Sequence, residues 1–201
     1  MHKTMFSTFI IKDILWLISK IFLWITGWRV EGEVPKDKKF VMIAAPHTSN
    51  WDLPYMLAIC FVLKVKPYWM GKSQIFKFPF AGLMKWMGGI AIDRSQSNNV
   101  VEATAEILKQ SDELIITIPP EGTRSKVRYW KSGFYHIADL ADVSIVLGFL
   151  DYKNKKGGIG GLIQPTGNLD NDMVKIKAFY QSLAENMLLK RFNSSNERSE
   201  N

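Results

Sequence analysis

The chain has 201 residues, of which 47% are hydrophobic, and it carries a formal net charge of +7. That length supports one hydrophobic core and leaves too little sequence for a second full-sized domain. A basic chain favours an anionic partner such as a membrane surface or a phosphorylated small molecule. Lysine and arginine are spread along the chain without a zinc-finger, helix-turn-helix or RNA-binding signature, so we expect no nucleic-acid partner. The single cysteine, Cys60, cannot form an internal disulfide, which fits a reducing compartment.

The segment 6–28 is the part of the chain best suited to membrane association. Polar side chains interrupt its apolar run, so no uncharged stretch approaches the ~20 residues that a transmembrane helix needs. These side chains are Lys12, Asp13, Ser19 and Lys20. On a helix they form a narrow stripe opposite Ile10, Ile14, Leu17, Ile21 and Trp24. The pattern predicts an amphipathic helix lying in the headgroup region, and the alternative is a helix whose apolar stripe packs on the core.

The rest of the chain alternates short apolar runs, typical of buried strands, with helical segments. Strands are expected over 28–33, 40–45, 67–71, 89–93, 113–118 and 143–149. Helices are expected over 51–63, 99–110, 132–141 and 170–191, with short helical pieces over 74–87. The glycine-rich stretch 157–164 is interpreted as a hairpin region. This order predicts a single-domain α/β fold with a mixed or largely parallel sheet flanked by helices.

We expect the domain organisation to follow from these segments. Residues 1–30 are expected to form the membrane-associating helix, 31–192 the folded domain and 193–201 a disordered tail. In α/β sheets, ligands bind at the loops beyond the carboxyl ends of strands. Polar loops follow the runs that end at Ala45, Ile92 and Ile118, and these loops hold the candidate functional residues.

His47 and Asp52 stand between the apolar run 40–45 and the helix expected at 51–63. Within one continuous helix, their five-residue separation would turn the side chains about 140° apart. If the helix begins near Ser49 or Asn50, the histidine lies in the preceding loop and the aspartate in the first turn, where they can meet. The carboxylate then fixes one imidazole nitrogen and leaves the other as a general base. The alternatives are an aspartate that only favours the helix dipole and a histidine that only caps the strand.

A second candidate site follows the strand expected at 113–118. Its residues after two prolines are Glu121, Gly122, Thr123, Arg124 and Ser125. The glycine lets the backbone turn tightly, and the arginine and hydroxyl side chains offer donors for phosphate oxygens. Lys131 adds positive charge that suits an anionic head group. The alternative is an ordinary turn with a solvated arginine.

The third candidate segment is 88–94, in which two glycines precede a strand-like run. Arg94 ends this run, so it is placed to point into the same cleft as Arg124. The alternative is that Asp93 and Arg94 form a surface ion pair of little consequence. The order, the spacing and the shared placement of the three segments at strand ends carry more weight than any one of them.

In these three segments the chain resembles the lysophosphatidic acid acyltransferases and the wider glycerolipid acyltransferase family. The family's first motif, a histidine followed after four residues by an aspartate, is matched by His47 and Asp52. The second motif is matched by residues 89–94, and the third by 121–125 continuing into 131–134. The resemblance covers about residues 40–150.

The resemblance implies roles for individual residues. His47 is the implied catalytic base and Asp52 the residue that orients it. The implied acceptor-binding residues are Arg94, Glu121, Gly122, Thr123, Arg124 and Ser125, with Lys131 beside them. No metal and no cofactor is implied, since acyl-CoA or acyl-carrier protein serves as co-substrate. The chain departs from the family's fourth motif, a proline, because the run 143–149 has none and Leu147 takes its place.

We therefore predict transfer of a fatty acyl group to the hydroxyl of 1-acylglycerol 3-phosphate in phospholipid biosynthesis. The alternatives are a different lysolipid or hydroxylated lipid as acceptor, a hydrolase, and a non-catalytic peripheral membrane-binding protein of the same fold. The resemblance and the lone cysteine place the protein at the cytoplasmic face of the inner membrane, as a peripheral or monotopic protein.

Overall fold

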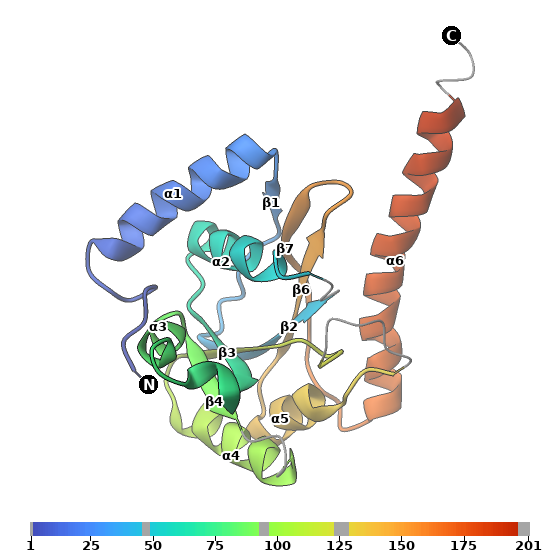
Figure 1. Ribbon diagram of the computed structural model, residues 1–201. Helices are drawn as coiled ribbons and strands as arrows, with labels where there is room; N and C mark the ends of the chain where they lie inside the picture. Colours follow the sequence, from blue (N-terminus) through green and yellow to red (C-terminus); the bar gives the residue numbers. More distant parts are fainter. Residues whose placement is uncertain (1, 46–48, 93–96, 123–128, 197–201) are drawn as a thin grey trace.

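A seven-stranded sheet forms the centre of the protein (Figure 1). The computed structural model describes residues 2–45, 49–92, 97–122 and 129–196. The strands are β1 (Arg29–Glu31), β2 (Lys39–Ala45), β3 (Pro67–Lys72), β4 (Gly89–Ile92), β5 (Leu114–Ile118), β6 (Ile145–Asp151) and β7 (Lys156–Ile163). The helices are α1 (Ile11–Thr26), α2 (Asp52–Leu63), the 3-10 turn η1 (Ser73–Phe76), α3 (Ala81–Trp86), α4 (Ser97–Gln110), α5 (Gly133–Ala141) and α6 (Leu169–Asn196).

The sheet is largely parallel, which confirms the predicted fold class. Its strand order is β1-β7-β6-β2-β5-β3-β4, and among the described pairs only β6 and β7 are antiparallel. The five mutually parallel strands β6, β2, β5, β3 and β4 therefore end at the same edge of the sheet. Because ligands gather at this edge in α/β folds, the loops after these strands are where a site is expected.

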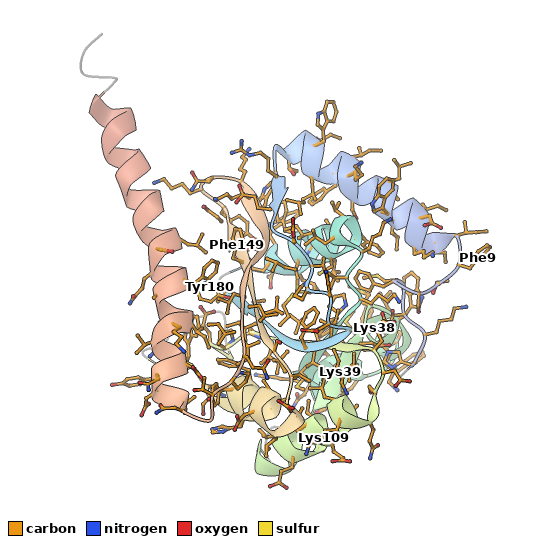
Figure 2. The ribbon with its side chains drawn as sticks, turned by 180° about the vertical axis from the view of Figure 1, so that it is seen from behind. Phe9, Lys38, Lys39, Lys109, Phe149 and Tyr180 are labelled. Carbon is orange, nitrogen blue, oxygen red and sulfur yellow. The ribbon has the colours of Figure 1, made fainter. Side chains whose placement is uncertain are left out.

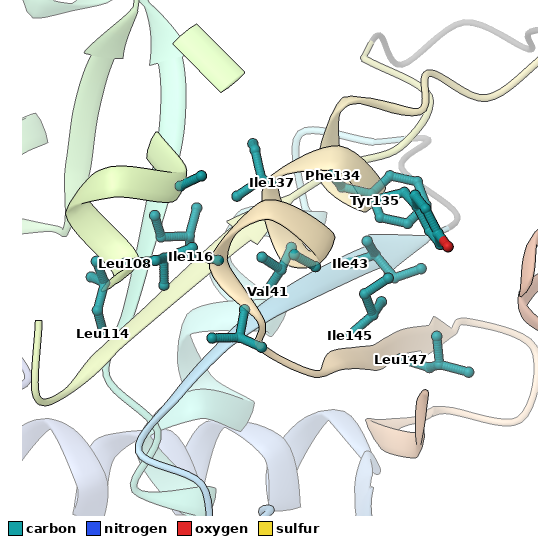
Figure 3. Packing of buried hydrophobic residues seen from close by; sticks show 14 of the residues in the cluster. Val41, Ile43, Leu108, Leu114, Ile116, Phe134, Tyr135, Ile137, Ile145 and Leu147 are labelled. Atoms are coloured by element: carbon teal, nitrogen blue, oxygen red, sulfur yellow. The ribbon is translucent and has the colours of Figure 1, made fainter. Parts of the chain in front are cut away.

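Side chains alternate between the two faces of the central strands, as a pleated sheet requires. In β2, Val41 and Ile43 pack with α4, α5 and α6, whereas Phe40 and Met42 pack with α2 and the N-terminal segment. Figure 3 shows the first of these layers, with Leu108, Ile137 and other apolar side chains between helices and sheet. The sheet is thus covered on both faces, which explains why its strands read as continuous apolar runs.

Helix α1 lies against α2 along one stripe and presents the opposite stripe outward. Ser19 and Leu23 are its buried residues. The exposed apolar side chains on and just before it are Phe9, Ile10, Ile11, Ile14, Leu17, Ile18, Ile21, Trp24 and Ile25. Figure 2 shows Phe9 pointing away from the body of the protein. The apolar stripe therefore does not pack on the core in the described structure. No helix within the described ranges is long and apolar enough to cross a membrane.

Two segments differ from the sequence predictions. The glycine-rich stretch 157–164 is not a hairpin by itself but the strand β7, and the turn of the hairpin comes before it, at 152–155. Here glycines allow close packing: a Cβ on Gly157 would lie 2.7 Å from Ile59 of α2. Helix α6 continues to Asn196, so it includes the first residues of the segment 193–201 expected to be a tail, and 197–201 lie outside the described residues.

Candidate active site

Asp52 is buried at the start of α2, close to the carboxyl edge of the sheet, and only 5% of its surface is exposed. The loop from β2 returns onto it, so that the backbone N–H of Ser49 donates to Asp52 Oδ2 at 2.9 Å. The hydroxyl of Ser49 in turn accepts from the N–H of Trp51 at 3.1 Å. This exchange resembles a capping box, in which an acid in the first turn reaches back to the residue before the helix. The local sequence therefore fixes the carboxylate in place.

The second oxygen of this carboxylate is held by a residue that sequence reasoning missed. Tyr152, directly after β6, donates its hydroxyl to Asp52 Oδ1 at 2.6 Å. Burial, followed by this hydrogen bond and the charge of Asp52, raises the pKa of Tyr152 above its ordinary value, so the phenol stays protonated as a donor. Its position in the sequence could have indicated it, because Tyr152 follows a predicted strand, as His47 does.

The described ends of the third predicted motif, at Gly122 and Lys131, lie together. Gly122 has a φ of 65°, the left-handed conformation that glycine adopts without strain. The N–H of Lys131 donates to the carbonyl of Pro120 at 2.8 Å. The side chain of Lys131 then passes over Gly122, where an added Cβ would meet its Cε at 3.1 Å. The structure therefore brings these two predicted residues together.

Glu121 takes a different direction. Burial, and after it the charge of Glu121, raises the pKa of Tyr180, so this carboxylate lies near α6. Tyr180 itself donates to the carbonyl of Gly148 of β6 at 2.9 Å, and Figure 2 labels it on α6. Glu121 does not line the cavity described next, unlike the neighbouring Gly122.

A largely apolar cavity of about 570 Å³ lies between the α2 face of the sheet and the helices that cover it. Its wall includes Asp52 and Gly122, so the first and third motifs border one space. Further along, apolar side chains from β2, α2, β3 and α3 line it, among them Met42, Met56, Trp69 and Met84. The volume falls within the ~300–1,000 Å³ range of sites for small molecules. Such a cavity suits a long apolar ligand with one polar end near Asp52.

Cys60 also lines this cavity, but its chemistry is that of a core residue. Burial raises the pKa of its thiol to about 12, so it is protonated at neutral pH and is not a nucleophile. No group of three or more His, Cys, Asp or Glu side chains in the part of the chain that the structure describes is arranged to hold a metal ion.

Several predicted site residues lie outside the described residues. They are His47, Arg94, Thr123, Arg124 and Ser125. The described residues that precede them are Ala45, Ile92 and Gly122, which end or follow β2, β4 and β5, and these three strands end at the same sheet edge. The described part of the site therefore consists of Asp52, Tyr152, Gly122, Lys131 and the cavity wall.

Comparisons with known proteins bear on the fold and the family of this chain. A family model described as Acyltransferase matches residues 28–146. The structure is similar to the crystal structure of the 1-acyl-sn-glycerophosphate (LPA) acyltransferase PlsC from Thermotoga maritima, with a TM-score of 0.61. That match covers 90% of this chain and 80% of the other at 18% identity, and it shows a shared fold.

A curated relative extends the comparison to sequence. The chain is 30% identical over 129 residues to the 1-acyl-sn-glycerol-3-phosphate acyltransferase of Haemophilus influenzae. The aligned part is 60% of this chain and 52% of that protein, so the chain spans about half the length of the curated relative. The family model covers more than half of the chain, including the first three motifs, and the chain therefore belongs to the acyltransferase family.

Proposed function

We propose that this protein transfers a fatty acyl group from acyl-CoA or acyl-carrier protein to the free hydroxyl of 1-acylglycerol 3-phosphate. The observation that carries the proposal is the buried Asp52, which is fixed at the rim of an apolar cavity of about 570 Å³. The names of the relatives in Haemophilus influenzae and Thermotoga maritima support the choice of acceptor. The cavity accounts for an acyl chain, and the positive charge of Lys131 suits a phosphate.

In the proposed reaction His47 is the general base and Asp52 holds its imidazole in the productive tautomer. The imidazole takes the proton of the acceptor hydroxyl while the oxygen attacks the thioester carbonyl carbon. The tetrahedral intermediate then collapses, the carbon–sulfur bond breaks, and the imidazolium returns its proton to the departing thiolate. The products are an ester and a free thiol, and no covalent enzyme intermediate is needed.

The proposed acceptor site joins Arg94, Glu121, Gly122, Thr123, Arg124, Ser125 and Lys131. Arginine side chains bind phosphate oxygens through paired N–H donors, and the tight turn at Gly122 lets Lys131 approach the same edge. Glu121, directed toward Tyr180, would position the loop from its α6 side. We further propose that residues 1–30 attach the domain 31–192 to the cytoplasmic face of the inner membrane, where its lipid substrates are found.

The test is thiol release from long-chain acyl-CoA by the purified protein in detergent, with and without 1-acylglycerol 3-phosphate. We expect release that depends on the acceptor and falls by at least about a hundredfold in His47→Ala, the range for loss of a general base. His136→Ala is the matched control, because His136 is an exposed histidine on α5.

Other outcomes separate the alternatives. Release that ignores the acceptor would identify a hydrolase. Thiol release only with another lysolipid would show acyl transfer to an acceptor other than 1-acylglycerol 3-phosphate. No release with acyl-CoA, acyl-carrier protein or a panel of lysolipids would contradict the proposal and leave a membrane-binding protein without catalysis.

A further inference from the structure

A second apolar surface, separate from α1, lies on η1, α3 and the turn that joins them. It presents the side chains of Ile75, Phe78, Phe80 and Leu83, with Phe78 96% exposed and Phe80 61% exposed. Large apolar side chains are rarely left so open in a cluster unless they contact something. The same segment carries three exposed lysines, and we call the whole set the η1–α3 surface. The lysines are Lys72, Lys77 and Lys85.

The segment that forms this surface is basic. Between Asp52 and Asp93 the sequence contains no acidic residue, while it contains five lysines. Exposed apolar side chains interspersed with exposed lysines match a bilayer with anionic headgroups, because the aromatic rings enter the acyl boundary and the ammonium groups stay among phosphates. An acidic protein partner would account for the lysines but not for two phenylalanines that reach outward.

The η1–α3 surface lies next to the segment that leads into α1. The segment before α1 is tied to α3, because the N–H of Met5 donates to the carbonyl of Trp86 at 2.8 Å and the indole of Trp86 donates to Thr8 at 3.3 Å. Both surfaces therefore belong to the same side of the sheet, the side that α2 covers.

This surface also borders the cavity near Asp52. Lys72, Ile75 and Met84 line that cavity, and Ile75 and Lys72 are at the same time exposed. We propose that the η1–α3 surface is a second membrane-docking surface that binds an anionic bilayer, and that acyl chains enter the cavity there. The docking stands independently of catalysis, whereas the role in acyl entry rests on the proposed function.

The experiment is binding to vesicles of phosphatidylcholine, with and without added phosphatidylglycerol. We expect Phe78→Ser/Phe80→Ser to weaken binding to both kinds of vesicle by about tenfold or more, because two aromatic rings can no longer insert into the bilayer. Lys77→Gln/Lys85→Gln should weaken binding to the anionic vesicles by about fivefold for each lysine and change binding to the neutral ones little. The matched control is Leu140→Ser/Val174→Ser, which removes exposed apolar side chains from α5 and α6.

Binding of the phenylalanine variant equal to that of the unaltered protein, or an equal loss in the control, would overturn the docking surface. An effect on binding of acidic acyl-carrier protein without an effect on vesicles would also overturn it, in favour of a protein partner. Thiol release measured in detergent with a water-soluble lysolipid tests the proposed function separately, since it needs no bilayer. If the unaltered protein transfers acyl groups in detergent but does not bind vesicles, only the docking surface is contradicted.

A different observation supports a second inference, on Tyr152. Two features of the structure fix this residue. Its ring meets Trp28 edge-on at 5.1 Å and Tyr55 at 5.7 Å between centroids. Its backbone follows Asp151, a buried residue whose carboxylate accepts from the N–H and the side-chain amide of Asn154 at 3.0 and 2.6 Å. The phenol thus reaches Asp52 from a rigid turn.

We infer that Tyr152 is a positioning residue for the acyl transfer, acting through Asp52. Its hydroxyl and the N–H of Ser49 each hold one carboxylate oxygen, at 2.6 and 2.9 Å, so the carboxylate has one orientation in which to meet its other neighbours. The donor also withdraws negative charge from the carboxylate. Loss of the hydroxyl therefore leaves Asp52 less fixed and more negative, and this inference rests on the proposed function.

The test is Tyr152→Phe, with Tyr55→Phe as the matched control in the same aromatic cluster. We expect kcat to fall by about fivefold to tenfold with little change in KM, the order of one charge-assisted hydrogen bond. A more negative Asp52 stabilises the imidazolium of His47, so the acidic limb of the pH–rate profile should move to higher pH. If Tyr152 had a purely structural role, Tyr152→Phe would lower activity without shifting the acidic limb of the pH–rate profile.

The outcomes separate this inference from the proposed function. If His47→Ala abolishes transfer while Tyr152→Phe changes neither kcat nor the pH limb, Tyr152 has no positioning role. If His47→Ala leaves transfer intact, the proposed base is wrong whatever Tyr152 does. An equal effect of Tyr55→Phe would assign the loss to the aromatic packing and overturn the role of the hydroxyl.

Discussion

Asp172, in the first turn of α6, is fully buried, and its carboxylate accepts several hydrogen bonds. Its carboxylate accepts from the N–H and hydroxyl of Thr166 at 2.7 and 2.9 Å, from the hydroxyl of Tyr135 at 3.0 Å, and from Lys175 at 3.0 Å. Burial by itself raises the pKa, but the hydrogen bonds outweigh it and lower the pKa of Asp172 from 3.8 to about 2. The charged form therefore ties α5, the β7–α6 turn and α6 together.

The pKa of Asp172 is lower in the folded than in the unfolded chain, so the carboxylate stabilises the fold fully above the unfolded value of 3.8. This contribution is lost as the pH falls toward 2. We expect Asp172→Asn to lower the free energy of unfolding at neutral pH by about 2 kcal/mol. Its stability should also depend less on pH between about pH 5 and pH 3 than that of the unaltered protein. Urea unfolding across this range is the measurement.

Asp170→Asn serves as the control, because Asp170 is exposed in the same helical turn. Equal urea midpoints for the two variants at every pH would contradict the role assigned to the buried carboxylate. The comparison separates the hydrogen-bond network from any general effect of acidic residues near the start of the helix.

At the residue scale the sequence predicted what is local and missed what is distant. The position of Asp52 in the first turn of α2 followed from the strand, the loop and the polar residues before the helix, all within a few positions. Tyr152 is its partner across 100 residues. That contact depends on β6 lying next to β2, and the spacing of motifs carries no information on which strands are neighbours. The residue roles of His47, Arg94 and the 123–125 segment stay predictions.

At the scale of elements, β7 shows why a glycine-rich run can be a strand. Gly158 pairs with Glu31 of β1, has a φ of 150°, and an added Cβ would lie 1.9 Å from the carbonyl oxygen of Glu31. A side chain there must push the two backbones apart. The glycines suggested a turn because turns and close backbone approaches both require the residue, and only the fold distinguishes them.

We expect Gly158→Ala to lower the free energy of unfolding by at least about 2 kcal/mol, because it combines an overpacked contact with an unfavourable φ. Gly161→Ala is the matched control in the same strand, since its Cβ would have Leu147 at 3.9 Å as its nearest neighbour and ordinary contact distance. Urea unfolding of both variants measures the difference. Equal stability of the two would contradict the close pairing of β1 with β7.

Most other elements were predicted to within about two residues. For the strands this is because both faces of the sheet are covered. Buried strands then appear as unbroken apolar runs of Val, Ile and Leu, as in β2, β5 and β6. The sheet order was not predictable in the same way. It places β6 beside β2 and brings β7 back antiparallel, and those choices depend on long-range packing.

For the whole molecule, the two faces of the sheet differ in what covers them. The α4, α5 and α6 side is a conventional core around Phe134 and Tyr135. The other side carries α1, α2 and α3, the cavity and the two outward apolar surfaces. The membrane docking proposed above would use this asymmetry, with the second side facing lipid while the first keeps the sheet stable in water.

The pairing of β1 with β7 also sets an order of events during synthesis. Glu31 meets Gly158, so the edge of the sheet closes only after more than a hundred further residues have left the ribosome. At ~5–20 residues per second this takes on the order of ten seconds. Throughout that time β1, which directly follows α1, has no strand to pair with. If α1 binds a bilayer as proposed, the domain can complete its sheet on a chain that is already held at the membrane.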